Sequence, residues 1–183
     1  MIVLEGIDGA GKSLLAQQLS SALNIAVHHS GGPPKSFEEI INRQVVMTQN
    51  LSRGFLLIYD RAPCISDPIY GSVIRGKTPF DDHPELGPAM RDHLIIPIIY
   101  CRPPTEKLLE VISTRQEAKK NYKPLEHMDG VKANYLCILK KYDLNIGYYP
   151  HWTYDWTGTT ESPSLQELID RIKRGLSLTE LIG

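Results

Sequence analysis

The chain has 183 residues, of which 42% are hydrophobic and 22% are charged, and its formal net charge at pH 7 is −1. This length can bury a sizeable core in one domain. The near-zero charge excludes a general attraction to nucleic acid or anionic membranes, so any phosphate binding has to come from local positive charge. Three dispersed cysteines suit a reducing compartment, and no apolar stretch is long enough to span a membrane. We therefore expect one cytoplasmic domain over residues 1–183, with no nucleic-acid or membrane partner.

Short apolar runs alternate along the chain with longer amphipathic segments. The apolar runs predict strands at residues 2–4, 26–28, 55–59, 95–100 and 152–155. The amphipathic segments predict helices at residues 12–23, 37–51, 105–120 and 131–142, and a closing helix after Ser164. Ser36 with Glu39, and Ser164 with Glu167, have the spacing of capping boxes. Alternating strands and helices predict a parallel sheet with helices on both faces.

Two stretches depart from this alternation. Residues 71–92 are rich in Gly, Pro and charged residues, which predicts an irregular segment with at most one short helix. Pro97 interrupts the apolar run at residues 95–100. Because proline cannot donate a hydrogen bond to a neighbouring strand, it predicts that this strand lies at a sheet edge or contains a bulge.

The stretch EGIDGAGKS, residues 5–13, has the spacing of a Walker A phosphate loop and lies between a predicted strand and a predicted helix. Its glycines let backbone N–H groups turn toward an anion, Lys12 can reach the β- and γ-phosphates, and the Ser13 hydroxyl can ligate Mg²⁺. We therefore predict an ATP site formed by Gly9, Ala10, Gly11, Lys12, Ser13 and Leu14. Asp8 does not fit a loop that binds anions, because it places a negative charge in its middle.

A second motif follows the predicted strand at residues 55–59. This strand ends at Asp60, as a Walker B strand does, where a carboxylate can reach Mg²⁺ or its bound waters. Arg61 comes next, and its guanidinium can hold a phosphate through two hydrogen bonds. An exposed ion pair at the strand end is the alternative interpretation. Together with Ser13, Asp60 is a predicted Mg²⁺ ligand.

EGIDGAGKS and a strand that ends in Asp60-Arg61 together resemble the thymidylate kinases, which are P-loop nucleoside monophosphate kinases. The resemblance is strong over residues 1–23 and 54–71. It implies the P-loop NTPase fold, a three-layer α/β sandwich with a five-stranded parallel sheet in the order 2-3-1-4-5. It also implies transfer of the ATP γ-phosphoryl group to a nucleoside monophosphate, with dTMP as the first acceptor to test. Analogy with the family favours a homodimer.

The resemblance also assigns acceptor-binding residues. In the family, the carboxylate that matches Asp8 hydrogen-bonds the 3′-hydroxyl of the acceptor sugar. The arginine that matches Arg61 holds the acceptor phosphate or the transferred group. Asn42-Arg43 resembles a pair in the family's second long helix, which makes Arg43 a candidate for contact with the base or the phosphate.

Two positions depart from the family pattern. Ala62 stands where many members carry an aromatic ring that helps to exclude ribose, and Tyr70 is the candidate to take over that discrimination. Glu39 stands where the family has the aromatic side chain on which the base stacks. Phe37 is nearby, but a packing role for it is the simpler interpretation. The sequence therefore leaves both the base and the sugar of the acceptor open.

A basic segment lies after the fourth predicted strand. Arg115, Lys119, Lys120 and Lys123 place four positive charges within nine positions. A solvated helix face is an equally good interpretation of such a run taken by itself. Its position beside the carboxyl end of a strand, where nucleotides bind, favours a lid over ATP at about residues 115–130. Arg115 is the first catalytic candidate there, and Arg102 is a further candidate on the ATP side.

The combined interpretation is an ATP- and Mg²⁺-dependent nucleoside monophosphate kinase. Lys12, Arg61 and Arg115 would stabilise phosphoryl charge, Asp60 would serve the metal, and Asp8 would orient the acceptor. One alternative is a kinase for deoxynucleosides or another small metabolite, whose hydroxyl acceptor needs a base, and Asp60 is the candidate. A second alternative is a non-catalytic nucleotide-binding module, which would release no ADP with any acceptor.

Overall fold

Five parallel strands form one sheet in the order β2-β3-β1-β4-β5, as predicted. The computed structural model describes residues 1–83, 97–114, 127–137, 151–158 and 161–180. The strands are β1 (Ile2–Glu5), β2 (Val27–His29), β3 (Ile58–Asp60), β4 (Ile98–Cys101) and β5 (His151–Tyr154). Leu4 of β1 lies opposite Asp60 of β3 and Ile99 of β4. Because every pairing is parallel, the carboxyl ends of the strands meet at one edge of the sheet.

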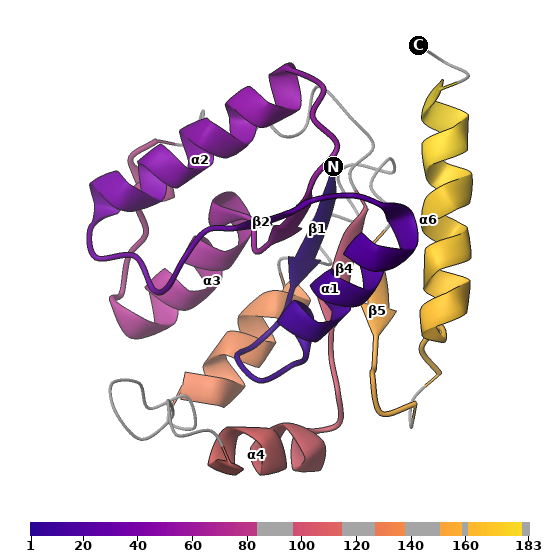
Figure 1. Ribbon diagram of the computed structural model, residues 1–183. Helices are drawn as coiled ribbons and strands as arrows, with labels where there is room; N and C mark the ends of the chain where they lie inside the picture. Colours follow the sequence, from indigo (N-terminus) through magenta and orange to yellow (C-terminus); the bar gives the residue numbers. More distant parts are fainter. Residues whose placement is uncertain (84–96, 115–126, 138–150, 159–160, 181–183) are drawn as a thin grey trace.

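Helices flank this sheet. They are α1 (Lys12–Leu23), α2 (Phe37–Ser52), α3 (Pro63–Ile74), α4 (Thr105–Thr114) and α6 (Leu165–Glu180), with a 3₁₀ turn η1 (Pro79–Asp81) and a helical segment at residues 127–137. In Figure 1, α1 and α6 lie side by side in front of the sheet, and α3 and the segment 127–137 lie behind it. The side-chain amide of Asn134 donates to the carbonyl oxygen of Ile69 at 3.3 Å, which joins the two rear helices.

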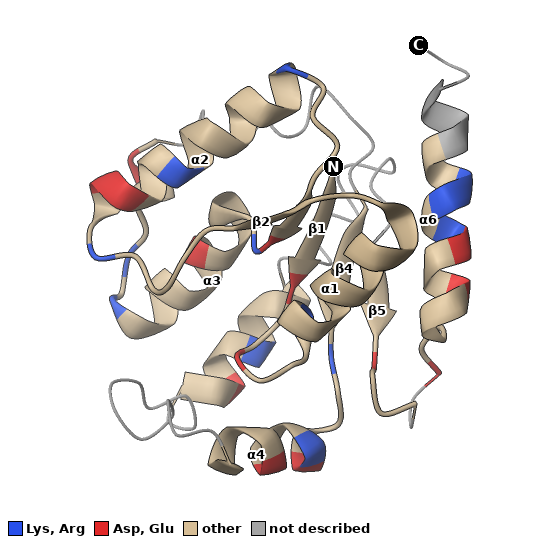
Figure 2. Cartoon of the chain, in the orientation of Figure 1, with Lys and Arg blue, Asp and Glu red and all other residues tan. Residues whose placement is uncertain are grey.

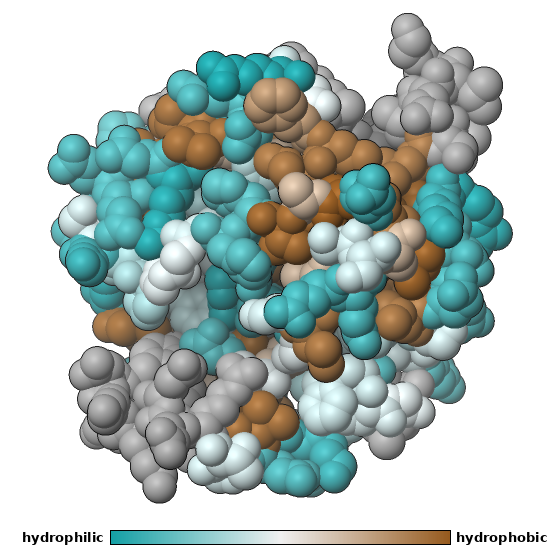
Figure 3. Space-filling model, viewed as in Figure 1, coloured by the Kyte–Doolittle hydropathy of each residue, from teal (hydrophilic) through white to brown (hydrophobic). Residues whose placement is uncertain are grey.

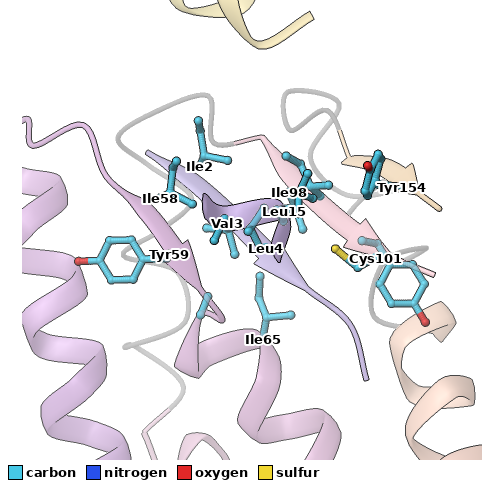
Figure 4. Close-up of a cluster of buried hydrophobic side chains, with 14 of the residues drawn as sticks. Ile2, Val3, Leu4, Leu15, Ile58, Tyr59, Ile65, Ile98, Cys101 and Tyr154 are labelled. Carbon is cyan, nitrogen blue, oxygen red and sulfur yellow. The ribbon is translucent and has the colours of Figure 1, made fainter. Parts of the chain in front are cut away.

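The central strand is buried because both faces of the sheet are covered. Ile2, Val3 and Leu4 each have 0% of their surface exposed. Leu15 of α1 and Ile65 of α3 join the same core cluster, which Figure 4 shows around β1. Each fully buried aliphatic side chain of this kind contributes about 1.5–3 kcal/mol to the free energy of unfolding.

One of the two predicted capping boxes is complete, at Ser164 and Glu167; at Ser36 only half of it forms, because the Glu39 carboxylate accepts from the Lys35 N–H instead of the Ser36 N–H. Ser36 Oγ accepts a hydrogen bond from the Glu39 N–H at 3.1 Å at the start of α2. Ser164 Oγ accepts one from the Glu167 N–H at 3.3 Å, and Glu167 Oε2 accepts from the Ser164 N–H at 2.8 Å. These bonds satisfy N–H groups that have no partner inside the helix, which is why α2 and α6 begin where the sequence predicts.

Two strand predictions need correction. β3 begins at Ile58 rather than at Phe55, and Phe55 and Leu56 leave 51% and 42% of their surface exposed. The edge or bulge predicted from Pro97 is wrong, because β4 lies between β1 and β5. Pro97 precedes β4 and contributes its carbonyl oxygen, which accepts from the Val3 N–H at 3.0 Å. That pairing needs no N–H from the proline.

α3 is the main element that the sequence patterns did not predict. It begins at Pro63, whose missing N–H costs nothing in the first turn of a helix, and it tolerates Pro68 in its interior. Residues 71–74, predicted to be irregular, form its last turn. The helix predicted at 131–142 extends back at least to residue 127. Residues 84–96, 115–126 and 138–150 lie outside the described residues, which includes parts of three predicted elements and most of the predicted lid.

The described surface carries charges of both signs. Lys, Arg, Asp and Glu are interspersed on α2, α4 and α6 (Figure 2). Figure 3 shows hydrophilic residues over α2 and α6 and apolar residues around α1 between them. Within the described part of the chain, no helix combines the length and the apolar character that crossing a bilayer requires.

Candidate functional site

The phosphate loop connects β1 to α1 at the carboxyl edge of the sheet. Gly6 has φ +141°, and a Cβ atom there would lie 2.5 Å from the carbonyl oxygen of Cys101. Gly11 has φ +87° at the start of α1, and a Cβ atom there would lie 2.7 Å from the indole of Trp156. Both positions therefore require glycine, and the loop delivers the first N–H groups of α1 to its concave side.

Lys12 folds back into this loop. Its Nζ donates to the carbonyl oxygens of Gly6 and Ile7 at 2.9 and 3.0 Å. Burial and, to a smaller extent, the positive charge of Arg61 lower the pKa of Lys12 to about 8, against the opposing effect of the Asp8 and Asp60 carboxylates. Such an ammonium group gains more from a nearby anion than an exposed lysine does, because an anion offsets its desolvation.

Ser13 and Asp60 meet across the loop. Ser13 Oγ donates to Asp60 Oδ2 at 3.1 Å, although the two residues come from different elements. A hydroxyl and a carboxylate are the oxygen ligands that Mg²⁺ prefers, so the pair fits the predicted metal site. His29 Nδ1 lies 3.8 Å from the same Asp60 oxygen. The described residues contain no group of three or more His, Cys, Asp and Glu side chains arranged to hold a metal by themselves.

Arg61 contacts Asp8 and Tyr70, two of the other residues predicted to bind the acceptor. Its Nη2 donates to Asp8 Oδ1 at 2.6 Å and to the Tyr70 hydroxyl at 3.0 Å, and its Nη1 donates to the Tyr135 hydroxyl at 2.9 Å. Burial alone would lower the pKa of Arg61, but Tyr135, Tyr70, Asp8 and Glu5 raise it well above its usual value. The guanidinium therefore stays charged. Its backbone φ of +78° is uncommon for a residue with a Cβ atom and marks a strained position.

A buried carboxyl group supports Arg61 from behind. Glu5 is fully buried and accepts hydrogen bonds from the Ala62 N–H at 2.7 Å and from the Ser66 hydroxyl at 2.9 Å. The Tyr135 hydroxyl also donates to Glu5 at 2.9 Å. Burial raises the pKa of Glu5, while the positive charge of Arg61 and these hydrogen bonds oppose the rise. This network fixes the end of β1 relative to the start of α3.

Two neighbouring cavities open at this edge. The first, which we call the phosphate cavity, has a volume of about 410 Å³ and is lined by Asp8, Gly9, Gly11, Lys12, Ser13, Leu14, His29, Ser30, Gly31, Asp60 and Arg61. The second, which we call the α2 cavity, has a volume of about 450 Å³ and is lined by His28, His29, Ser30, Ser36, Glu38, Glu39, Asn42, Arg43 and Val46. His29 and Ser30 line both, so the cavities adjoin.

Most of the predicted site residues come together, but not all. Ala10 is buried and does not line the phosphate cavity. Arg43 lines the α2 cavity, where Nη1 donates to the Gly32 carbonyl oxygen at 2.9 Å and Nη2 pairs with Glu39. Arg102 follows β4, and its N–H donates to the Tyr154 carbonyl oxygen at 2.8 Å. Arg115, Lys119, Lys120 and Lys123 lie outside the described residues.

Sequence reasoning missed three residues of this region: Glu5, Tyr135 and His29. In the sequence, Glu5 is a polar residue at the end of a strand, which is usually exposed. Its burial depends on hydrogen bonds to Ala62 and Ser66, which are distant in the sequence. Tyr135 lies 74 positions after Arg61, with no motif around it. His29 belongs to none of the motifs that mark site residues in the sequence. Its place at the end of β2, beside the Asp60 strand, was the signal available.

Comparison with known proteins shows the fold. No family model and no curated protein sequence matches the chain. A structure of deoxyadenosine kinase from M. mycoides, with the products dCMP and a flexible dCDP bound, matches 97% of this chain and 98% of its own at 18% identity and a TM-score of 0.58. The YorR protein from Bacillus subtilis, in complex with phosphorylated GDP, matches 98% of this chain and 96% of its own at 20% identity and a TM-score of 0.55. With the strand order, these matches confirm the predicted α/β P-loop NTPase fold.

Proposed function

We propose that this chain is an ATP- and Mg²⁺-dependent kinase that phosphorylates a nucleoside or deoxynucleoside monophosphate to the diphosphate. The observation that carries this proposal is the contact between Asp8 and Arg61 beside the phosphate loop, 2.6 Å between Oδ1 and Nη2. A phosphate loop that binds a single nucleotide needs only backbone N–H donors and a positively charged side chain. A carboxylate and a guanidinium on its outer side suit a second substrate that carries both a hydroxyl and a phosphate.

The donor side uses the phosphate loop. Backbone N–H groups from Gly9 to Leu14 would bind the ATP phosphates, and Lys12 would leave its carbonyl partners to contact the β- and γ-phosphates. Trp156, whose indole lies against Gly11, borders the same loop and offers an aromatic surface near the donor. Arg115 in the predicted lid remains a candidate for neutralising charge on the transferred group.

The acceptor side uses Asp8, Arg61 and Tyr70. Asp8 would accept a hydrogen bond from the sugar hydroxyl, and Arg61 would hold the acceptor phosphate in line with the γ-phosphoryl group. A monophosphate oxygen is an adequate nucleophile, so catalysis needs no general base and consists mainly of positioning and charge stabilisation. Ser13 and Asp60 would hold Mg²⁺, which when bound neutralises charge on the ATP phosphates.

Two classes of acceptor fit this site. The family resemblance alone favours dTMP. A nucleoside kinase is the second candidate, because Asp60 lines the phosphate cavity and its carboxylate is able to act as a base toward a hydroxyl acceptor. Its fit to the Ser13 hydroxyl favours the metal role instead.

An ADP-release assay tests the proposal across all common ribonucleoside and deoxynucleoside monophosphates and the corresponding nucleosides. ADP release that depends on a monophosphate supports the monophosphate kinase. Release with nucleosides alone supports the second candidate. Tight ATP binding without ADP release for any acceptor would leave a non-catalytic nucleotide-binding module.

A further inference from the structure

The α2 cavity carries a paired carboxylate and guanidinium on one helix face. Glu39 and Arg43 lie one turn apart on α2, and Arg43 Nη2 donates to Glu39 Oε1. Figure 2 shows the acidic first turn of α2 followed by the basic residue. The two side chains are 35% and 20% exposed, so both are accessible from the cavity yet partly shielded from water.

Both side chains are held in place. Glu39 Oε2 accepts from the Lys35 N–H at 2.8 Å, and Arg43 Nη1 donates to the Gly32 carbonyl oxygen at 2.9 Å. The Lys35 hydrogen bond and the Arg43 contact lower the pKa of Glu39, so the carboxylate is ionised at neutral pH. Each carboxylate oxygen keeps a second lone pair, and Arg43 has further N–H groups for a ligand.

The pair lies next to the proposed acceptor site. Gly31 lines the phosphate cavity, and a Cβ atom built on it would lie 3.6 Å from Arg43 Nη2. His29 and Ser30 line both cavities. A nucleotide whose phosphate and sugar contact Arg61 and Asp8 can therefore extend its base into the α2 cavity, whose 450 Å³ volume is in the usual range for small-molecule sites.

The four common bases differ in what they present to a carboxylate. Guanine offers two adjacent N–H donors, at N1 and N2, with the acceptor O6 beside them. Thymine offers one N–H between two carbonyl oxygens. Adenine and cytosine each offer an amino group beside a ring nitrogen lone pair, which repels a carboxylate oxygen. Two parallel charge-assisted hydrogen bonds from one base edge to one carboxylate are available only to guanine.

We propose that Glu39 and Arg43 make the α2 cavity a guanine site, so that the preferred acceptor is a guanosine or deoxyguanosine monophosphate. Glu39 accepts the N1–H and N2–H hydrogen bonds, and Arg43 donates to O6. This inference rests on the proposed function for its placement of phosphate and sugar. It departs from the thymine expected by resemblance, because the stacking position holds Glu39 instead of an aromatic ring.

The first test measures equilibrium binding of dGMP, dTMP, dAMP and dCMP by calorimetry, without ATP, and then kcat/KM for the same acceptors by ADP release. We expect dGMP to bind at least about tenfold more tightly than the others. Tighter binding of any other base overturns the guanine site, even if that base is phosphorylated efficiently. Preferential dGMP binding without ADP release supports the site and contradicts the proposed kinase.

The second test uses Glu39→Gln, with Glu38→Gln as its matched control. Both remove one negative charge from the first turn of α2, and both residues line the cavity, but the structure pairs Arg43 with Glu39. Glutamine can still accept from the Lys35 N–H, so the helix start should survive, which thermal unfolding checks. We expect Glu39→Gln to reduce the affinity for dGMP by about 10- to 100-fold. The affinity for dAMP should increase relative to that for dGMP, because a glutamine amide can form two hydrogen bonds with adenine. Equal effects of the two variants overturn the proposal.

Discussion

The Asp8 carboxylate contacts the Arg61 guanidinium at 2.6 Å, although the two residues belong to different motifs. Asp8 is the charge that did not fit a phosphate loop, and Arg61 follows the strand that ends at Asp60. Their contact places a positive charge against the Asp8 carboxylate. An ion pair at this position, half exposed on the Asp8 side, remains accessible to an acceptor.

Asp8→Asn tests the acceptor role. Losing a charge-assisted hydrogen bond costs about 1.5–3 kcal/mol, so we expect kcat/KM for the acceptor to fall by about 10- to 100-fold. The dissociation constant of ATP, measured by calorimetry, should change little. A variant that loses ATP affinity while its acceptor KM is preserved would show that Asp8 serves the donor.

Lys12→Ala should reduce phosphoryl transfer by about 10²- to 10³-fold, because the transferred phosphoryl group then lacks the positively charged side chain that would stabilise its negative charge. The buried carbonyl oxygens of Gly6 and Ile7 also lose a hydrogen-bond donor, so some loss of stability is expected beside the loss of activity. Single-turnover ADP formation and thermal unfolding should be compared. A large loss of stability together with normal turnover of the folded fraction would contradict the catalytic role.

The lowered pKa of Lys12 predicts a proton linkage. With a pKa of about 8, roughly half of the Lys12 side chains are neutral at pH 8, and bound phosphates raise the pKa by adding negative charge. Binding of a non-hydrolysable ATP analogue at pH 8 should therefore take up about half a proton, and almost none at pH 6.5. Calorimetry in buffers with different ionisation enthalpies measures this. Lys12→Arg, which stays protonated, should show no uptake at either pH.

Asp60→Asn should raise the Mg²⁺ concentration needed for half-maximal activity by about tenfold or more, because it removes the carboxylate paired with Ser13. A magnesium titration at saturating ATP measures the effect. The base role proposed in the nucleoside-kinase alternative predicts a different pattern, with kcat lost at every Mg²⁺ concentration and the half-saturation point unchanged.

Tyr135→Phe removes the hydroxyl that connects Arg61 to Glu5. We expect a loss of about 1–3 kcal/mol in the free energy of unfolding, measured with urea, because both partners lose a hydrogen bond in a buried site. The acceptor KM should also rise as Arg61 loses its fixed orientation. Tyr59→Phe is the control, since the Tyr59 hydroxyl accepts from the Asn50 side chain at 2.7 Å and neither residue lines the phosphate cavity or the α2 cavity. If the two variants have the same kinetics, Tyr135 is only structural.

The features that the sequence predicts correctly are those determined by residues close together in the chain. Burial of both sheet faces makes β1 an uninterrupted apolar run, and Ser36 and Ser164 mark helix starts through bonds to residues three positions away. These features are local, so they can be read from neighbouring residues. The phosphate loop is also local, and the structure places Lys12 and Ser13 at the cavity that the motif predicts.

Features that depend on distant partners could not be predicted in this way. Pro97 indicated an edge strand, because the sequence does not show that its carbonyl is the group facing Val3. α3 contains Pro63 and Pro68, which disfavour a helix locally, yet its buried face packs on the sheet and overrides that preference. Tyr135 reaches Arg61 only after the chain has formed β4 and α4.

The left-handed backbone of Arg61 determines how this position should be mutated. A residue with a Cβ atom pays about 1–2 kcal/mol for such a φ value, whereas glycine does not. Arg61→Ala would keep that strain while removing the contacts that offset it, so it would combine a folding defect with the loss of the guanidinium. Arg61→Gly removes the guanidinium and the strain together. Glycine is therefore the appropriate reference for measuring what this side chain contributes to substrate binding.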